Sequence, residues 1–160
     1  ADQMLAACLA AGTVDIAVCA AAVADWKVAR PARAKIKKKA GAEPPVLTMV
    51  PNPDILATLS SLGAAAEPTR PTLVVGFAAE TEDLVANAID KRRRKGCDWI
   101  VANDVSPATG TFGGERNTVH LISAAGVEDW PTLAKDEVAS RLAARIALHF
   151  AEPPAAKAAE

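Results

Sequence analysis

Apolar runs of strand length recur along the chain and alternate with segments that have helical periodicity. The run Asp15–Ala24 is nearly continuous, which is typical of a strand buried on both faces. Two further buried strands are predicted at Thr72–Phe77 and Asp98–Asn103, with shorter candidates at Val46–Val50 and Thr118–Ser123. Strands that alternate with helices favour a mainly parallel sheet covered on both sides. The pattern therefore predicts an α/β fold.

Four helices are predicted from residue periodicity and from end signals. Gly12 stands where a helix-terminating glycine belongs, Asn52 followed by Pro53 is a typical helix start, and Thr81 is a candidate N-cap. In chain order, the predicted helices span residues 2–11, 52–62, 81–95 and 135–150.

Three segments lack a period and are predicted to be irregular. Trp26–Pro45 is rich in Lys, Arg, Ala and Pro, and a loop of that length in a compact domain is usually functional or disordered. Asp104–Asn117 carries Gly, Pro and Ser, and residues 151–160 are expected to form a disordered tail. We therefore predict one domain, residues 1–150, followed by this tail.

Composition and charge exclude several classes of protein. The chain has 160 residues, 51% of them hydrophobic, and its net charge of −1 does not favour nucleic acid or an anionic membrane. The longest strongly apolar stretch is too short to span a bilayer. Three widely spaced cysteines, Cys8, Cys19 and Cys97, indicate small buried side chains in a reducing cytosol rather than disulfides or structural zinc.

Polar side chains follow four of the predicted strands. In a doubly wound sheet, ligands bind at the carboxyl ends of the strands. These ends are followed by Asp25, by Asn52-Pro53-Asp54, by Phe77 to Thr81 and by Asn103-Asp104. The Asp25 carboxylate could bind a divalent cation or a substrate hydroxyl, or equally cap a helix or turn. Asp54 lies in a helix start whose free N–H groups would suit an anion.

Two basic clusters remain. Lys91 and Lys95 lie four residues apart on one helix face, which either complements the helix dipole or holds a triphosphate. The run from Lys35 to Lys39 lies in the aperiodic segment, so it is either a solvated loop or a cationic lid. A nucleic-acid patch is an alternative, although few aromatic residues accompany it.

Six motifs occur in order between Ala21 and Ile122, within a match that runs from about Ala1 to Phe150. They are AAVADW (Ala21–Trp26), KIKK (Lys35–Lys38), NPDIL (Asn52–Leu56), VGFAAET (Val75–Thr81), KRRRKGCDWIVANDV (Lys91–Val105) and a final F-x4-N-x-V-x-LI (Phe112–Ile122). Together they resemble the phosphopantothenoylcysteine synthetases, also called phosphopantothenate–cysteine ligases. In bacteria this enzyme is the C-terminal half of a bifunctional coenzyme A biosynthesis protein, behind a flavin-dependent decarboxylase.

The resemblance implies a three-layer Rossmann-like fold, a cytoplasmic homodimer, and CTP and Mg2+ as co-substrate and cofactor, with FMN only on a fused decarboxylase. The 4′-phosphopantothenate carboxylate would attack the α-phosphate of CTP, and the cysteine amine would then displace CMP to form an amide. Lys35 and Lys38 match the family's catalytic flap, and Asp25 would also face the metal. The implied CTP contacts are Cys19, Ala20, Ala21, Asp25, Lys35, Pro53, Asp54, Ile55, Leu56, Phe77, Lys91 and Lys95.

One departure from the family affects the expected activity. Family members begin with a strand, a glycine-rich turn and an asparagine-bearing segment that this sequence lacks. We therefore expect a domain truncated at its N-terminus that binds CTP weakly and ligates poorly. A nicotinamide-dependent reductase on the same fold is an alternative, although the chain contains no GxGxxG motif.

Overall fold

The computed structural model describes residues 1–32, 34–37, 41, 43–105 and 114–151, and the chain divides into two compact units. The first unit comprises Ala1–Val74 with Lys95–Cys97, and the second comprises Val75–Arg94 with the chain from Asp98 onward. The predicted tail, apart from Ala151, and Lys38 lie outside the described residues.

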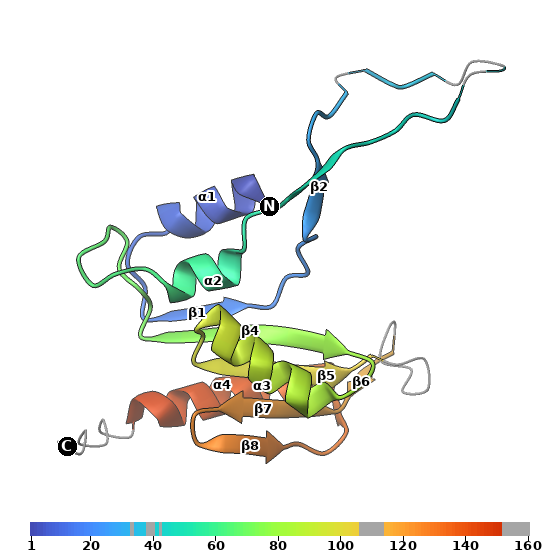
Figure 1. Ribbon diagram of the computed structural model, residues 1–160. Coiled ribbons are helices and arrows are strands. Elements are labelled where there is room, and N and C mark those ends of the chain that lie inside the picture. Colours follow the sequence, from blue (N-terminus) through green and yellow to red (C-terminus); the bar gives the residue numbers. More distant parts are fainter. Residues whose placement is uncertain (33, 38–40, 42, 106–113, 152–160) are drawn as a thin grey trace. The chain divides into compact units, whose positions relative to one another are not determined.

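The second unit is built on a sheet in which neighbouring strands follow the order β4-β5-β7-β8 (Figure 1). Its main elements are β4 (Leu73–Glu80), α3 (Leu84–Lys95), β5 (Trp99–Asp104), β7 (Val119–Ser123), β8 (Gly126–Asp129) and α4 (Lys135–Ala151). β4 and β5 are parallel, whereas β7 is antiparallel to both of its neighbours, β5 and β8. Three of these four strands therefore run in one direction, which confirms the mainly parallel sheet.

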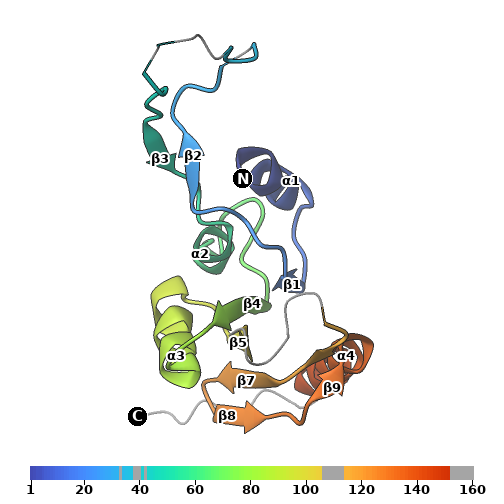
Figure 2. The ribbon, with the colours of Figure 1, turned by 90° about the vertical axis from the view of Figure 1, so that its right-hand side faces the viewer.

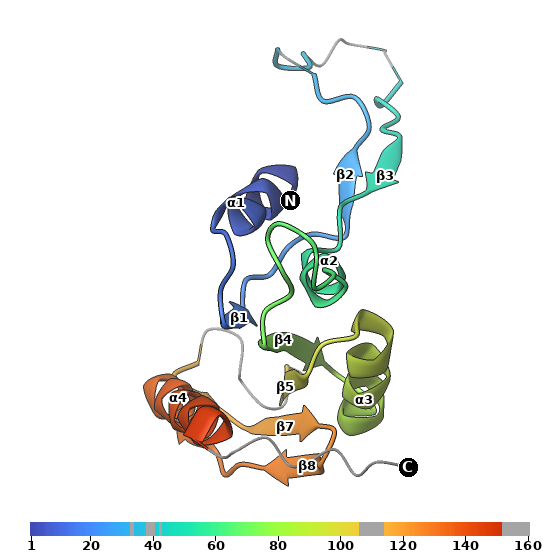
Figure 3. The ribbon, with the colours of Figure 1, turned by 90° about the vertical axis from the view of Figure 1, so that its left-hand side faces the viewer.

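Helices cover both faces of this sheet. Figures 2 and 3 show α3 on one side of the strands and α4 on the other, which confirms the three-layer α/β architecture. The core strands of this unit are buried as their apolar runs predict, because Val75, Ile100 and Val101 are fully enclosed. The predicted strands at 72–77, 98–103 and 118–123 and the predicted helix at 135–150 are thus confirmed to within a few residues.

Short strands that the sequence pattern does not predict complete this unit. β6 (Arg116–Asn117) lies in the segment expected to be a loop and pairs with β9 (Leu133–Ala134). β8 carries only one large apolar side chain, Val127, so the sequence shows no alternation of apolar and polar residues that would predict a strand there.

The first unit contains α1 (Asp2–Ala10), β1 (Ile16–Cys19), β2 (Trp26–Val28), β3 (Met49–Pro51) and α2 (Ile55–Ser60). β2 and β3 form an antiparallel ribbon at the base of the predicted excursion. β1 lies beside the first residues of β4 that belong to this unit, since the Leu73 N–H donates to the Asp15 carbonyl at 3.0 Å.

The prediction that Asp15–Ala24 forms a strand buried on both faces is wrong. The strand ends at Cys19, where the sequence turns to alanine, a residue with low β-propensity. Ile16 and Val18 are 38% and 45% exposed. Helix α1, which begins where predicted, contributes no buried residue to cover them among the described part of the chain.

Three boundaries also differ from the sequence prediction. The strand expected at Val46–Val50 begins at Met49, and Val46 is 95% exposed. The second helix begins at Ile55 because Asp54, not Asn52, is its N-cap, and it ends at Ser60. The third helix begins at Leu84 rather than after Thr81, and a left-handed residue, Asp83 (φ 46°), immediately precedes it.

No helix in the described ranges is both long and apolar enough to cross a membrane.

Candidate functional site

Several predicted contact residues of the first unit lie on the loop between β1 and β2. Cys19 is the last residue of β1, and Ala20, Ala21 and Asp25 follow it in an exposed segment that ends where β2 begins. Burial raises the pKa of the Cys19 thiol above its ordinary value, and nearby Cys8 adds to this rise. The Cys19 side chain is therefore a neutral thiol at pH 7 and offers no charge to a ligand.

This loop is tied to the start of α2 by one residue, Asn52. Its side-chain amide donates to the carbonyl oxygen of Ala24 at 2.8 Å, and its backbone N–H donates to that of Asp25 at 2.7 Å. The predicted groups Asp25 and Pro53–Leu56, separated by 27 residues, are thereby brought together. The sequence indicated Asn52 only as a helix cap.

Asp54 performs the capping role instead and also holds Lys95. Its Oδ1 accepts the Ala57 N–H at 3.0 Å, while its Oδ2 forms an ion pair with the ammonium group of Lys95. The Lys95 side chain is only 20% exposed. The expected open helix start is thus closed by a carboxylate that neutralises one of the two predicted phosphate-binding lysines.

The predicted catalytic lysines lie away from regular structure. Lys35 is exposed in the described stretch 34–37, beyond the β2–β3 ribbon, and Lys38 lies outside the described residues. Their pairing as a flap therefore stays a prediction.

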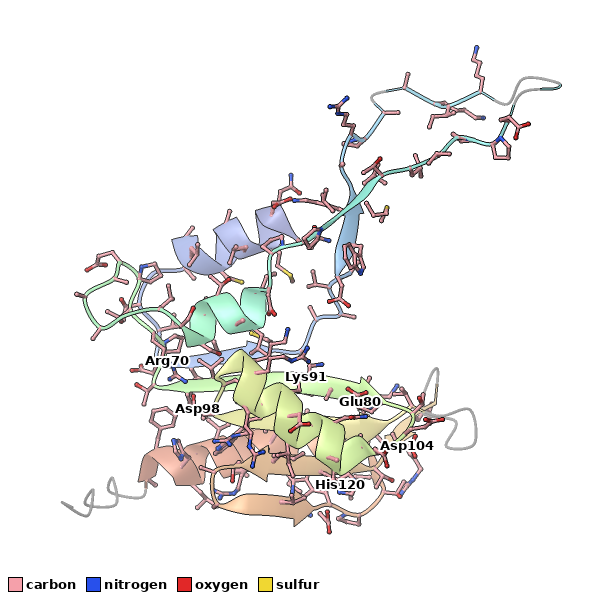
Figure 4. The ribbon with its side chains drawn as sticks, viewed as in Figure 1. Arg70, Glu80, Lys91, Asp98, Asp104 and His120 are labelled. Atoms are coloured by element: carbon pink, nitrogen blue, oxygen red, sulfur yellow. The ribbon has the colours of Figure 1, made fainter. Side chains whose placement is uncertain are left out.

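In the second unit, Lys91 borders an open surface depression of about 520 Å³ along α3. The lining residues are Glu80, Asn87, Asp90, Lys91, Arg93 and Arg94. Figure 4 marks Lys91 on the helix and Glu80 at the end of β4. Within the described ranges, no hydrogen bond or ion pair engages the Lys91 ammonium group, whereas Arg93 pairs with Asp90 at 3.8 Å. Lys91 is therefore a half-buried cation that is available to an anion.

Phe77 does not lie with Lys91. In the strand register it stands opposite Val101, on the sheet face that also carries Trp99. Trp99 contacts α4 through Arg145 and His149, whereas α3 covers the other face. Within this unit, Phe77 and Lys91 therefore belong to opposite sides of the sheet.

Asp25, the predicted metal ligand, is exposed just before β2 begins. In the part of the chain that the structure describes, no group of three or more His, Cys, Asp or Glu side chains could hold a metal ion. A single exposed carboxylate nevertheless fits Mg2+ that arrives with a nucleotide, because Mg2+ keeps several waters and is commonly held by one or two carboxylates plus phosphates.

Comparisons with known proteins identify related chains. Residues 1–149 match the family described as the DNA/pantothenate metabolism flavoprotein C-terminal domain. The coenzyme A biosynthesis bifunctional protein CoaBC of Vibrio cholerae is 41% identical over 125 residues, which cover 78% of this chain and 30% of that protein. CoaBC of Escherichia coli is 40% identical over 133 residues, covering 82% of this chain and 32% of the relative.

Solved structures agree with this likeness. The crystal structure of the C-terminal domain of CoaBC aligns with a TM-score of 0.68 and 28% identity, covering 96% of this chain and 64% of that one. The DNA/pantothenate metabolism flavoprotein from Streptococcus pneumoniae aligns with a TM-score of 0.54 and 19% identity over 71% of this chain and 46% of that one, which shows the fold alone. The chain spans about a third of the length of the curated relatives quoted above.

Proposed function

The chain belongs to the family of DNA/pantothenate metabolism flavoprotein C-terminal domains, and from this premise we propose that it is the nucleotide-binding part of a phosphopantothenate–cysteine ligase in coenzyme A biosynthesis. The observation that carries the proposal is Lys91. It is a half-buried cation without a partner in the described chain, placed on α3 within a KRRRK motif that resembles the ligases. An unpaired, partly desolvated ammonium group is costly unless a bound anion compensates it.

In the proposed reaction, the carboxylate of 4′-phosphopantothenate attacks the α-phosphate of CTP and pyrophosphate leaves. The amine of cysteine then attacks the acyl-cytidylate, and CMP leaves as the amide forms. Negative charge builds up on the leaving pyrophosphate, so the protein's contribution is cationic stabilisation rather than a nucleophile. Lys91 supplies charge from α3, and Lys35 and Lys38 supply it from the segment beyond the β2–β3 ribbon.

Asp25 would hold Mg2+ together with the triphosphate, and the ion would neutralise phosphate charge. The loop residues Cys19–Ala21 would approach the nucleotide through their backbone, because alanine side chains and a neutral thiol provide no charge. Phe77 is proposed as an apolar contact from β4.

We further propose a cytoplasmic homodimer, and a fused or bound phosphopantothenoylcysteine decarboxylase that carries the FMN. The bifunctional relatives support the fusion. Exposed apolar side chains on and near the β2–β3 ribbon, including Trp26 and Met49, support self-association. Sedimentation equilibrium of the protein tests the dimer directly.

The function is tested by calorimetric titration with CTP and with ATP in the presence of Mg2+. We expect saturable binding that favours CTP, and a Lys91→Ala variant that binds about tenfold or more weakly, since a charge-assisted contact contributes about 1.5–3 kcal/mol. Lys135→Ala removes the same charge from the start of α4 and serves as the control. Equal affinity of the wild type and the Lys91 variant would contradict the assignment of Lys91, and absence of CTP binding by the wild type would contradict the nucleotide site of this chain.

A further inference from the structure

We propose that Asn52 is a positioning residue of the nucleotide site, which fixes the Ala24–Asp25 segment against the start of α2. The inference rests on the proposed function and concerns a residue to which the sequence assigned only a capping role.

Asn52 continues the β2–β3 ribbon by one further pair of residues. Trp26 stands opposite Pro51 in the ladder, so the next position places Asp25 beside Asn52. The Asn52 backbone N–H donates to the Asp25 carbonyl at 2.7 Å, and the side-chain amide reaches one residue further, to the Ala24 carbonyl at 2.8 Å. Two successive carbonyl groups of the loop are thus bound by one residue.

The backbone ladder does not supply this second bond. Backbone groups of alternate residues face the partner strand in an antiparallel pair, so with Asp25 and Asn52 paired the Ala24 carbonyl lies outside the ladder. The side-chain amide of Asn52 reaches it instead and adds no charge. This accounts for an asparagine that does not cap the helix it precedes.

The tie leads directly to the charged part of the unit. Asp54, two residues after Asn52, caps α2 and pairs with Lys95. The order of contacts is therefore Ala24 and Asp25, then Asn52, then Asp54, then Lys95. A shift of the 52–54 backbone would displace the loop residues and the Asp54–Lys95 pair relative to each other, although Asn52 itself touches no ligand in this proposal.

The experiment uses two variants and one control. Asn52→Leu has nearly the shape of asparagine but no donor, and Asn52→Gln keeps an amide on a longer arm. Ser61→Ala removes a different side-chain bond to a backbone carbonyl, from Ser61 Oγ to Thr58 at 3.0 Å, at the other end of α2. Urea unfolding first establishes that every variant is folded under the binding conditions.

Two readouts are then measured. The first is the affinity for CTP with Mg2+, which we expect to fall about 3- to 10-fold in Asn52→Leu, the range of one hydrogen bond, and less in Asn52→Gln. The second is acrylamide quenching of tryptophan fluorescence without nucleotide. Trp26 is 59% exposed beside Asp25, whereas Trp99 and Trp130 are buried, so quenching reports the tied segment and should change in Asn52→Leu.

The outcomes separate the two proposals. Weaker CTP binding in Asn52→Leu, with Ser61→Ala equal to the wild type, supports the positioning role. Wild-type affinity in Asn52→Leu, or an equal loss in Ser61→Ala, overturns it while leaving the proposed function intact. A wild type that does not bind CTP overturns the proposed function and this inference with it, even if the quenching changes.

Discussion

Glu128 on β8 joins the sheet of the second unit to helix α4, and its removal has a calculable effect on stability. Its Oε1 accepts the indole N–H of Trp130 at 2.8 Å, and its carboxylate forms ion pairs with Arg141 at 3.5 Å and Arg145 at 3.3 Å. The two guanidinium groups also lie over Trp130 and Trp99, at 5.0 Å and 5.5 Å from the ring centres. One carboxylate therefore organises two arginines and two buried indoles.

The two parts of this interaction have different magnitudes. Trp130 is 3% exposed, so Glu128→Ala leaves a buried N–H without an acceptor, which costs about 1–3 kcal/mol. The ion pairs are about 34–41% exposed and contribute about 0.2–1 kcal/mol each. Glu128→Ala should therefore lower the free energy of unfolding by about 1.5–5 kcal/mol. Glu128→Gln keeps an acceptor and loses the charge, so its loss should be about 0.5–2 kcal/mol.

Urea denaturation followed by circular dichroism measures both losses. At about 1 M salt the Debye length is only about 3 Å, so the loss in Glu128→Gln should shrink while most of the loss in Glu128→Ala remains. If the two variants are equally destabilised at high salt, the indole hydrogen bond is not the dominant contribution. If neither variant loses more than about 0.5 kcal/mol, the range of an ordinary surface substitution, α4 is held by its apolar contacts alone.

Two further predictions concern the first unit. The Arg70 guanidinium group donates to the carbonyl oxygens of Ser60, Pro71 and Gly96 at 2.9, 2.8 and 3.4 Å. Arg70→Ala should therefore lower the free energy of unfolding by about 2 kcal/mol, and Arg70→Lys should recover part of that loss. Equal stability of Arg70→Ala and the wild type in urea would contradict this prediction. Because burial raises the pKa of Cys19, iodoacetamide should modify this thiol more slowly than free cysteine at pH 8. The stability that the raised pKa contributes is present below the pKa of the unfolded state and should be lost as the pH rises through the pKa of the folded state. Mass spectrometry of the Cys19 peptide measures the modification rate, and a rate equal to that of free cysteine would refute the raised pKa.

The buried strands could be predicted from the sequence because their own residues specify them. Leu73–Val75 and Trp99–Val101 lie in apolar runs of strand length that contain β-branched residues, and the structure encloses them. The same reasoning failed at Ile16 and Val18. Apolar composition indicates that burial of a strand would be favourable, but it does not show that another element covers that strand. Helix α1 supplies no buried residue to cover Ile16 and Val18.

Contacts between distant residues could not be predicted. The pair of Asp54 with Lys95 spans 41 residues, and the Asn52 bond to Ala24 spans 28. Each of these side chains has an ordinary local interpretation: a cap, a helix-end cation, a turn. Only the antiparallel pairing of β2 with β3 brings Asn52 to the loop. That pairing involves three residues of each strand, and they show too little alternation of apolar and polar residues to be predicted from the sequence.

These contacts also distinguish two lysines that the sequence treats alike. Spacing places Lys91 and Lys95 on one stripe of a helix, and the family resemblance assigns both to CTP. Lys95 is already neutralised by a carboxylate that also caps α2, so an anion that engages Lys95 must compete with Asp54 or share the ammonium group with it. Lys91 has no such competitor in the described chain. The attraction of a triphosphate to α3 should therefore come chiefly from Lys91, while Lys95 mainly keeps the residues around Asp54 in place, a division of roles that no inspection of charge spacing alone could reveal.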